Sequence, residues 1–198
     1  MEESQSIAEL AASYLAQVTE SLARLPLENI EPIVLCLEEA RLKRRQVFIC
    51  GNGGSAATAS HFACDLAKGA LLPHKPAIKV LPLADSLPLL SAWANDLSYD
   101  EVFARKLAPW VQAGDVVIGI SGSGNSQNVL NALRLAKEAG ATTIGLTGFD
   151  GGKLRDIADI CLVVPSRSVE QIEDVHLLLC HLTAICLRKI GSTADYRV

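Results

Sequence analysis

The chain has 198 residues, of which 49% are hydrophobic and 20% are charged, so it is long and apolar enough for one domain with a substantial core. Its net charge of −4 excludes the broadly basic surface of a nucleic-acid-binding protein. Six cysteines without a CxxC pair are typical of buried thiols in a reducing compartment. We find no secretory signal and no apolar run long enough to cross a membrane, so the sequence predicts a cytoplasmic protein with neither membrane nor nucleic-acid partners.

The N-terminal part of the chain predicts two helices that precede the first strand. Small and apolar side chains recur at helical spacing from about residue 3 to 24, as at Ile7 and Leu10. A second helix is expected at about 29–44. A helical pair in this position often packs on a neighbouring subunit.

From residue 46 onward, short β-rich runs alternate with helical stretches. The runs are continuously apolar rather than alternating, as strands covered on both faces must be. This order predicts a three-layer, doubly wound α/β fold with about five parallel strands. The expected strands are 46–50, 77–83, 115–121, 142–148 and 160–165, and the expected helices are 55–67, 86–107, 126–139, 152–158 and 172–189. We expect one domain over 1–198, with helices at 1–45, the α/β core at 46–190 and a tail at 191–198.

Two loops rich in Gly, Ser and Asn follow predicted strands and lead into predicted helices. They are GNGGS at 51–55 and SGSGNS at 121–126. Ligands of such sheets bind beyond the carboxyl ends of the strands, where both loops lie. Glycine allows the backbone to approach a ligand closely, and the free N–H groups of a helix start attract anions. The pair of loops therefore predicts a phosphate-binding site, although either loop alone is also compatible with a turn and a helix cap.

The loops do not fit a nucleotide-binding motif well. GNGGSA satisfies the looser dinucleotide pattern G-x-G-x-x-A, but the acid expected about 20 residues later is missing, since the nearest candidate is Asp85. No Gly-Lys-Ser/Thr sequence closes either loop, which excludes a Walker motif. A phosphate on a small molecule, held by serines and backbone amides, is the better interpretation.

Ionisable side chains gather on two predicted helices. His61 and Asp65 are four residues apart and share one helix face, as a metal-ligand pair, an acid/base pair or an ordinary surface pair would. Glu173 and His181 are eight residues apart, about 12 Å of helix rise. One site takes both only if Glu173 lies on the loop before the helix, or if they come from different subunits. His176, among leucines, is expected to be structural.

A third loop at the same edge of the sheet ends in WANDLSY. Its Asn95 and Asp96 are candidates for hydrogen bonds to sugar hydroxyls, or alternatively for an Asx turn.

Taken together, the ordered motifs resemble the SIS-domain proteins of the phosphoheptose isomerase family. The likeness rests on GNGGS, HFACDLAKG, ANDLSYDEVF, SGSGNSQNV, GLTGFDGGKL and IEDVHLLLCH, and it extends over essentially the whole chain. The resemblance implies a flavodoxin-like sheet and a homotetramer with active sites at subunit interfaces. It also implies isomerisation of sedoheptulose 7-phosphate to a glycero-manno-heptose 7-phosphate through an enediol, with one Zn²⁺ per subunit.

The resemblance also implies roles for individual residues. Asp65 and His181 fall at the acid/base positions, and the zinc positions are those of His61, Asp65, Glu173 and His181. The substrate-binding positions correspond to Asn52, Gly53, Gly54, Ser55, Asp65, Asn95, Asp96, Ser121, Gly122, Ser123, Ser126 and Glu173, with the three serines of the second loop on the phosphate.

The chain departs from the family pattern at three of these positions. It has Asp65 where Glu is usual, Glu173 where Gln is usual, and Gly122 where Thr is common. The shorter Asp changes the reach of the carboxylate, and the extra charge of Glu173 would strengthen metal binding. A non-catalytic alternative also exists within the same family, either a sugar-phosphate sensor or a protein that associates with the replication initiator. The His and carboxylate pairs favour the enzyme.

Overall fold

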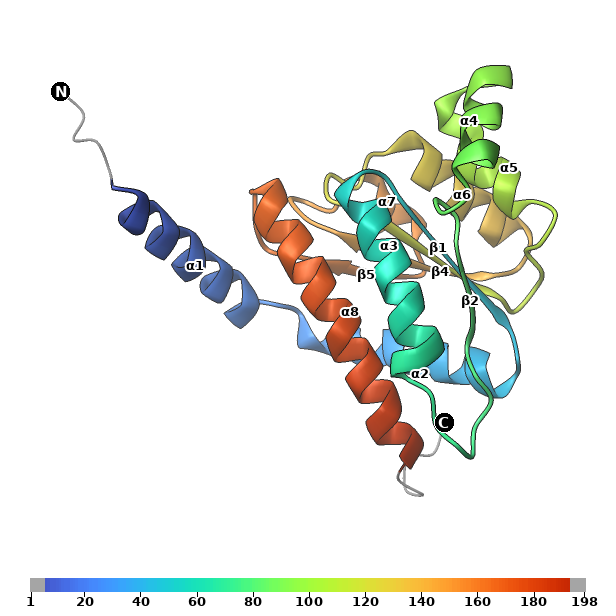
Figure 1. Ribbon diagram of the computed structural model, residues 1–198, viewed down its shortest axis with the longest axis horizontal. Helices are drawn as coiled ribbons and strands as arrows, with labels where there is room; N and C mark the ends of the chain where they lie inside the picture. Colours follow the sequence, from blue (N-terminus) through green and yellow to red (C-terminus); the bar gives the residue numbers. More distant parts are fainter. Residues whose placement is uncertain (1–5, 193–198) are drawn as a thin grey trace.

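The computed structural model describes residues 6–192 and contains a five-stranded parallel sheet between two layers of helices (Figure 1). The strand order is β2-β1-β3-β4-β5, which confirms the expected flavodoxin-like, doubly wound topology. The strands are β1 (Gln46–Gly51), β2 (Lys79–Pro82), β3 (Val116–Ser121), β4 (Thr142–Thr147) and β5 (Ile160–Val163).

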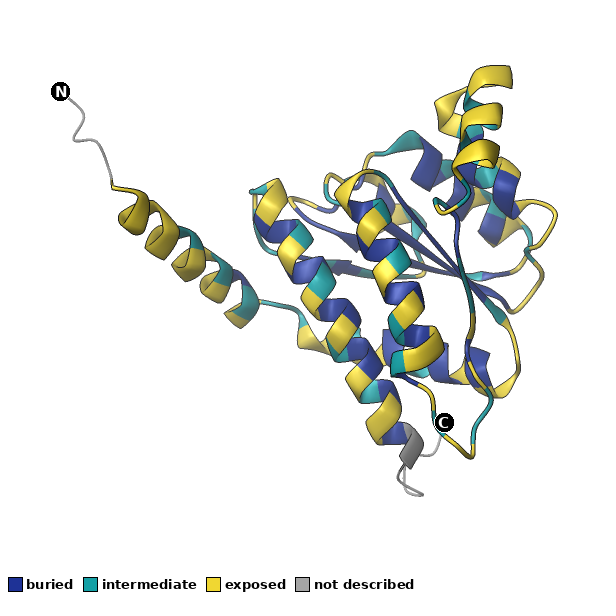
Figure 2. Cartoon of the chain, in the orientation of Figure 1, coloured by how far each residue is buried: buried dark blue, intermediate teal, exposed yellow. Residues whose placement is uncertain are grey.

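The central strands are buried on both faces, because each face is covered by helices. Val47 and Ile49 of β1 belong to one apolar cluster, and Phe48 and Cys50 belong to the other. The first face carries α2 (Ile30–Leu42), α3 (Gly54–Cys64) and α8 (Val169–Ser192). The second face carries α4 (Leu87–Asp96), α5 (Val102–Leu107), α6 (Gln127–Glu138) and α7 (Gly152–Ile157). In Figure 2 the strands are mostly dark blue, as expected of a core between these layers.

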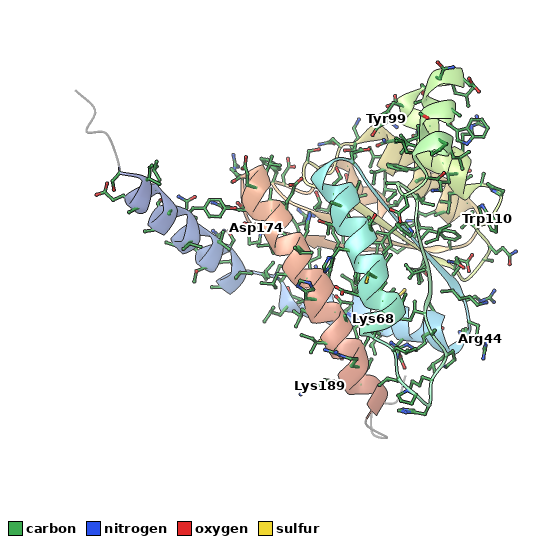
Figure 3. All side chains as sticks on the ribbon, in the orientation of Figure 1. Arg44, Lys68, Tyr99, Trp110, Asp174 and Lys189 are labelled. Atoms are coloured by element: carbon green, nitrogen blue, oxygen red, sulfur yellow. The ribbon has the colours of Figure 1, made fainter. Side chains whose placement is uncertain are left out.

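Helix α1 (Ile7–Ala23) stands apart from this body and projects away from the sheet (Figure 1). It begins with a capping box between Ser6 and Glu9. Its contact with α8 is polar: the Tyr14 hydroxyl donates to Asp174 (2.5 Å), labelled in Figure 3. Most residues of its outer turns are exposed (yellow in Figure 2), and these include the large apolar residues Ile7, Leu10 and Leu15.

Two predicted helices differ from the observed ones. The prediction of one helix over 86–107 is wrong, because α4 ends at Asp96 and Leu97 leaves the helical region (φ −126°, ψ −88°). A 3₁₀ turn, η3 (Tyr99–Glu101), then leads into α5. The helix expected at 55–67 continues instead as the π-helical turn η2 (Asp65–Gly69), in which the Ala70 N–H donates to the Asp65 carbonyl (2.7 Å).

The remaining boundaries lie within a few residues of their predicted positions. Another 3₁₀ turn, η1 (Leu27–Asn29), precedes α2. Helix α8 starts three residues before the predicted position 172 and reaches Ser192, so it includes the first two residues of the expected tail. The rest of that tail, 193–198, and the first residues of the first expected helix lie outside the described residues. No helix within 6–192 is both long and apolar enough to cross a membrane.

Candidate active site

The two glycine-rich loops lie side by side at the carboxyl edge of the sheet. β1 and β3 are paired neighbours, with Gly51 opposite Ile120, so the residues that follow both strands emerge together. In the order β2-β1-β3-β4-β5 this is the point at which the chain switches direction along the sheet, and ligands of such folds bind there. Asn52 and Asn128 join the two loops through a reciprocal pair of side-chain hydrogen bonds, each 2.9 Å long.

The first loop turns sharply into α3. Gly53 has a φ of +53°, which favours glycine, and α3 begins at Gly54. Ser55 is buried directly behind the turn. The carboxylate of Glu173, from α8, lies against Gly54, since a methyl group added at Gly54 would lie 2.3 Å from Glu173 Oε2. A carboxylate beside the N-terminus of a helix interacts favourably with the helix dipole.

The second loop is arranged around the start of α6. The hydroxyls of Ser121 and Ser126 lie 3.0 Å apart, and the Gly124 N–H donates to the Ser121 carbonyl (3.0 Å). The Ser123 hydroxyl accepts from the Asn125 N–H (3.2 Å). Serine hydroxyls and free N–H groups at a helix start form a suitable anion site. Gly122 leaves room for a side chain, because a methyl group there would have its nearest neighbour, a carbon of Ile172, at 3.9 Å.

A hollow of about 320 Å³ lies beside this second loop. Ser123, Asn125, Phe149, Asp150 and Arg167 line it. Its size is in the range of small-molecule sites. Arg167 supplies a guanidinium that pairs well with phosphate, and sequence reasoning had not singled it out.

His61, Asp65 and His181 form the one group of possible metal ligands found among the described residues. The two imidazole Nε2 atoms lie 2.8 Å apart, and they lie 3.4 Å and 3.8 Å from Asp65 Oδ2. Both imidazoles are half-exposed on the outer side of α3 and α8. The structure thus brings together three of the four predicted metal ligands.

The geometry of this group fits a divalent metal ion. Ligand atoms at 2.0–2.1 Å in a tetrahedral zinc site are separated by roughly 3.3 Å, and the three observed separations bracket that value. Asp65 Oδ2 is buried and has no hydrogen-bond partner, so an ion would satisfy an oxygen that the protein leaves unpaired. Three protein ligands of this kind leave room around a metal ion for a further ligand or for substrate.

Glu173 does not join this group within one chain. It lies in the second turn of α8, two helical turns before His181, and its carboxylate is at Gly54. Of the two possibilities raised by the sequence, the loop position for Glu173 is therefore wrong. A metal site that includes Glu173 requires a second subunit.

The remaining predicted residues have different surroundings. Asn95 and Asp96 are exposed at the end of α4, where the Asn95 amide donates to Asp96 Oδ1 (2.9 Å). His176 is fully buried, and its Nε2–H donates to the Thr147 carbonyl (3.2 Å), as expected of a structural histidine. Burial lowers the pKa of His176 from 6.5 to about 4, so the imidazole is neutral.

Besides Arg167, sequence reasoning missed Asn128 and Tyr99. Both lie within the quoted motifs SGSGNSQNV and ANDLSYDEVF. A polar residue in the first turn of a helix that follows a glycine-rich loop is the signal for Asn128. No pattern in the chain indicates that the Tyr99 hydroxyl would reach Asn52 (2.9 Å), because α3, β2 and α4 lie between the two residues in the chain.

Comparison with known proteins identifies the family. The SIS domain family model matches residues 13–148. The phosphoheptose isomerase of Aliarcobacter butzleri is 42% identical over 167 residues, 84% of this chain and 86% of that protein. The Helicobacter pylori (strain Shi470) phosphoheptose isomerase is 39% identical over 175 residues, 88% of each. The solved phosphoheptose isomerase GmhA from Neisseria gonorrhoeae superimposes with a TM-score of 0.86 at 30% identity, covering 93% of this chain and 100% of that one. The chain therefore belongs to the SIS domain family and, more narrowly, to its phosphoheptose isomerases.

Proposed function

We propose that this protein is an aldose–ketose isomerase that converts D-sedoheptulose 7-phosphate into D-glycero-D-manno-heptose 7-phosphate through an enediol. The observation that carries the proposal is the group formed by His61, Asp65 and His181, in a chain 42% identical to a phosphoheptose isomerase. Such a group supplies both a carboxylate and imidazoles for proton transfer.

The second loop is proposed to hold the phosphate. Its serine hydroxyls and the N–H groups at the start of α6 would bind the dianion, and Arg167 adds a positive charge beside them. Binding at this end of the substrate would orient the distant carbonyl end. The other proposed substrate contacts are Asn52, Gly53, Gly54, Ser55, Asp65, Asn95, Asp96, Gly122 and Glu173.

Asp65 and His181 are proposed to move the protons. The Asp65 carboxylate would remove a proton from C1 of the ketose and return it to C2 after the enediol has formed. The His181 imidazole would donate a proton to the C2 oxygen and accept the proton of the C1 hydroxyl, through Nδ1 when Nε2 holds the metal, so that the carbonyl moves from C2 to C1. Each transfer by a positioned side chain typically contributes about 10²–10⁴-fold in rate.

We propose that one Zn²⁺ per subunit is held by His61, Asp65 and His181, with Glu173 contributed across a subunit interface. When bound, the ion would polarise the substrate carbonyl and stabilise negative charge on the enediolate. The unpaired Asp65 Oδ2 and the separations of the three ligand atoms support this assignment.

A homotetramer with active sites at subunit interfaces is also proposed. Two features support it: the metal group is half-exposed on the outer side of α3 and α8, and the projecting α1 exposes apolar side chains. Large apolar side chains gathered on one free helix are typical of an interface. A cytoplasmic location is proposed on the six free cysteines, since disulfides are rare in that compartment.

The non-catalytic alternative is less well supported, because it leaves the His61–Asp65–His181 group without a role. The test is an assay of the purified protein, loaded with Zn²⁺, against a panel of ketose phosphates, together with a measurement of bound metal. We expect turnover of sedoheptulose 7-phosphate and stoichiometric zinc. The absence of both metal and turnover, with retained binding of a sugar phosphate, would favour the sensor.

A further inference from the structure

Three side chains from three separate segments meet where β1 and β3 end. Asn52 follows β1, Asn128 lies in the first turn of α6, and Tyr99 lies in η3. The Asn52 and Asn128 amides exchange two hydrogen bonds of 2.9 Å, and the Tyr99 hydroxyl donates to Asn52 Oδ1 at 2.9 Å. Asn128 is only 2% exposed, so its amide must be satisfied within the protein.

A backbone donor fixes the orientation of both amides. The Val129 N–H donates to Asn128 Oδ1 (2.9 Å), and because an N–H can only donate, the oxygen of Asn128 must face it. Asn128 Nδ2 is then the atom that donates to Asn52 Oδ1, and Asn52 Nδ2 donates in return to Asn128 Oδ1. The carbonyl oxygen of Asn52 consequently faces inward.

The Tyr99 hydroxyl provides the second hydrogen bond to that oxygen. Asn52 Oδ1 accepts from both Asn128 Nδ2 and the Tyr99 hydroxyl, which fills its two lone pairs. Asn52 Nδ2 has two N–H groups, and within residues 6–192 only one of them is used, toward Asn128. Asn52 is half-buried at the switch point of the sheet, so its second amide N–H is the side-chain group that it can offer to a ligand.

The segment that carries Tyr99 is itself held against α6. Asn131 donates through Nδ2 to the Asp100 carbonyl (3.0 Å) and to the Glu101 carboxylate (3.2 Å). Tyr99 is 49% exposed, and its ring is labelled in Figure 3. Its hydroxyl is therefore placed by the docking of η3 on α6 rather than by burial of the ring.

We infer that Tyr99 and Asn128 are positioning residues, which hold Asn52 so that it presents a single N–H donor to an oxygen of the bound sugar. The inference rests on the proposed isomerase function. It makes Asn52 selective for an acceptor, such as a carbonyl or hydroxyl oxygen. A site that holds a donor in a fixed orientation rejects a ligand lacking the matching oxygen more strongly than a flexible amide does.

The test is a double-mutant cycle on the kinetics with sedoheptulose 7-phosphate. Loss of one neutral hydrogen bond corresponds to roughly 2- to 12-fold, so Tyr99→Phe is expected to raise KM by about 3- to 10-fold, with a smaller change in kcat. Asn128→Asp cannot donate to Asn52 Oδ1 and is expected to lower kcat/KM by more than about 10-fold. In an Asn52→Ala background, Tyr99→Phe is expected to have no further effect, because Tyr99 acts through Asn52.

Tyr14→Phe is the matched control, since it removes a hydroxyl that is bonded to Asp174, away from Asn52. Thermal unfolding of every variant separates positioning from loss of folding. The inference would be overturned if Tyr99→Phe changed the kinetics equally in the wild-type and Asn52→Ala backgrounds. It would also be overturned if Tyr99→Phe alone had wild-type kinetics. If the wild-type protein binds the sugar phosphate without turnover, the proposed function fails. The double-mutant cycle is then measured with binding affinities from calorimetry in place of kinetic constants. A protein that neither binds nor converts it overturns both.

Discussion

The Nε2 atoms of His61 and His181 lie 2.8 Å apart, although 120 residues separate the two histidines in the chain. Packing of α3 on α8 brings them together: Phe62 on one helix and Leu179 and Cys180 on the other are buried in the same cluster. The reactive group is therefore built on two rigid helices rather than on the glycine-rich loops.

Replacement of either histidine by alanine should remove metal and activity without unfolding the protein. Each imidazole is half-exposed, so its loss leaves no large cavity, and the unfolding free energy should change by less than about 1 kcal/mol. Zinc content by mass spectrometry, turnover and thermal unfolding would be measured on His61→Ala and His181→Ala. Full activity in His181→Ala would show that the assigned acid/base role is wrong.

Substitution of two neighbouring glycines, Gly53 and Gly54, is expected to have different effects. Gly54→Ala places a methyl group 2.3 Å from Glu173 Oε2, and the flexible carboxylate must swing away from the loop. We expect kcat/KM to fall by about 10-fold, with stability nearly unchanged, since alanine is favoured in a helix. At Gly53 the backbone conformation (φ +53°, ψ −121°) is unfavourable for alanine, and we expect a loss of about 1–3 kcal/mol in unfolding free energy.

Urea unfolding and steady-state kinetics on both glycine variants measure these effects. Wild-type kinetics in Gly54→Ala would show that the position of the Glu173 carboxylate does not matter for the reaction. An unchanged urea midpoint for Gly53→Ala would show that the loop does not require glycine at this position.

The sheet was predictable from the sequence, and the start of α8, which places Glu173 on the helix, also had a sequence signal that the prediction missed. Continuous apolar runs identify all five strands. The central strands β1, β3 and β4 are buried on both faces and need few polar residues, whereas the edge strands β2 and β5 are shorter and less buried. Glu173 and His181 both lie within α8, which begins at Val169, three residues before the predicted start, so about two helical turns separate them. The sequence SVEQ at 168–171 contains the Ser-x-x-Gln signal for such a start, and the Gln171 N–H does face the Ser168 hydroxyl at 3.5 Å.

The π-helical turn at Asp65–Gly69 had no usable signal in the sequence. Its residues, DLAKG, are compatible with a continued α-helix. The break between α4 and η3 has a partial signal in the sequence, because serine is favoured just before a helix start. Ser98 precedes η3 in an extended conformation, as helix-capping serines do. The Tyr99–Asn52 contact depends on that break and on tertiary packing, which local patterns do not encode.

The exposed apolar side chains of α1 lead us to predict that subunit assembly depends on this face of the helix. Leu10 is 52% exposed and Ile7 is 86% exposed, although both are large and apolar. Leu10→Glu should therefore shift the proposed tetramer toward smaller species, measured by light scattering after size-exclusion chromatography. Ala16→Glu, on the opposite face of the same helix and also exposed, is the control and should assemble normally. Equal elution of all three proteins would exclude this face from the interface.

Buried His176 predicts a loss of stability in mild acid. Its folded-state pKa of about 4 lies below the ordinary value of 6.5, so between these values the unfolded chain binds more protons. The stabilising effect of a neutral His176 is thus complete above about pH 6.5 and decreases as the pH falls toward 4, by up to about 3 kcal/mol.

Carboxylates also titrate in this pH range, so the contribution of His176 is measured as a difference between two proteins. Urea unfolding of the wild type and of His176→Gln is compared near pH 7 and near pH 5. Glutamine retains a donor for the Thr147 carbonyl but does not titrate, and the variant should lose less stability on acidification. Parallel pH dependence of the two proteins would show that His176 is not the group responsible.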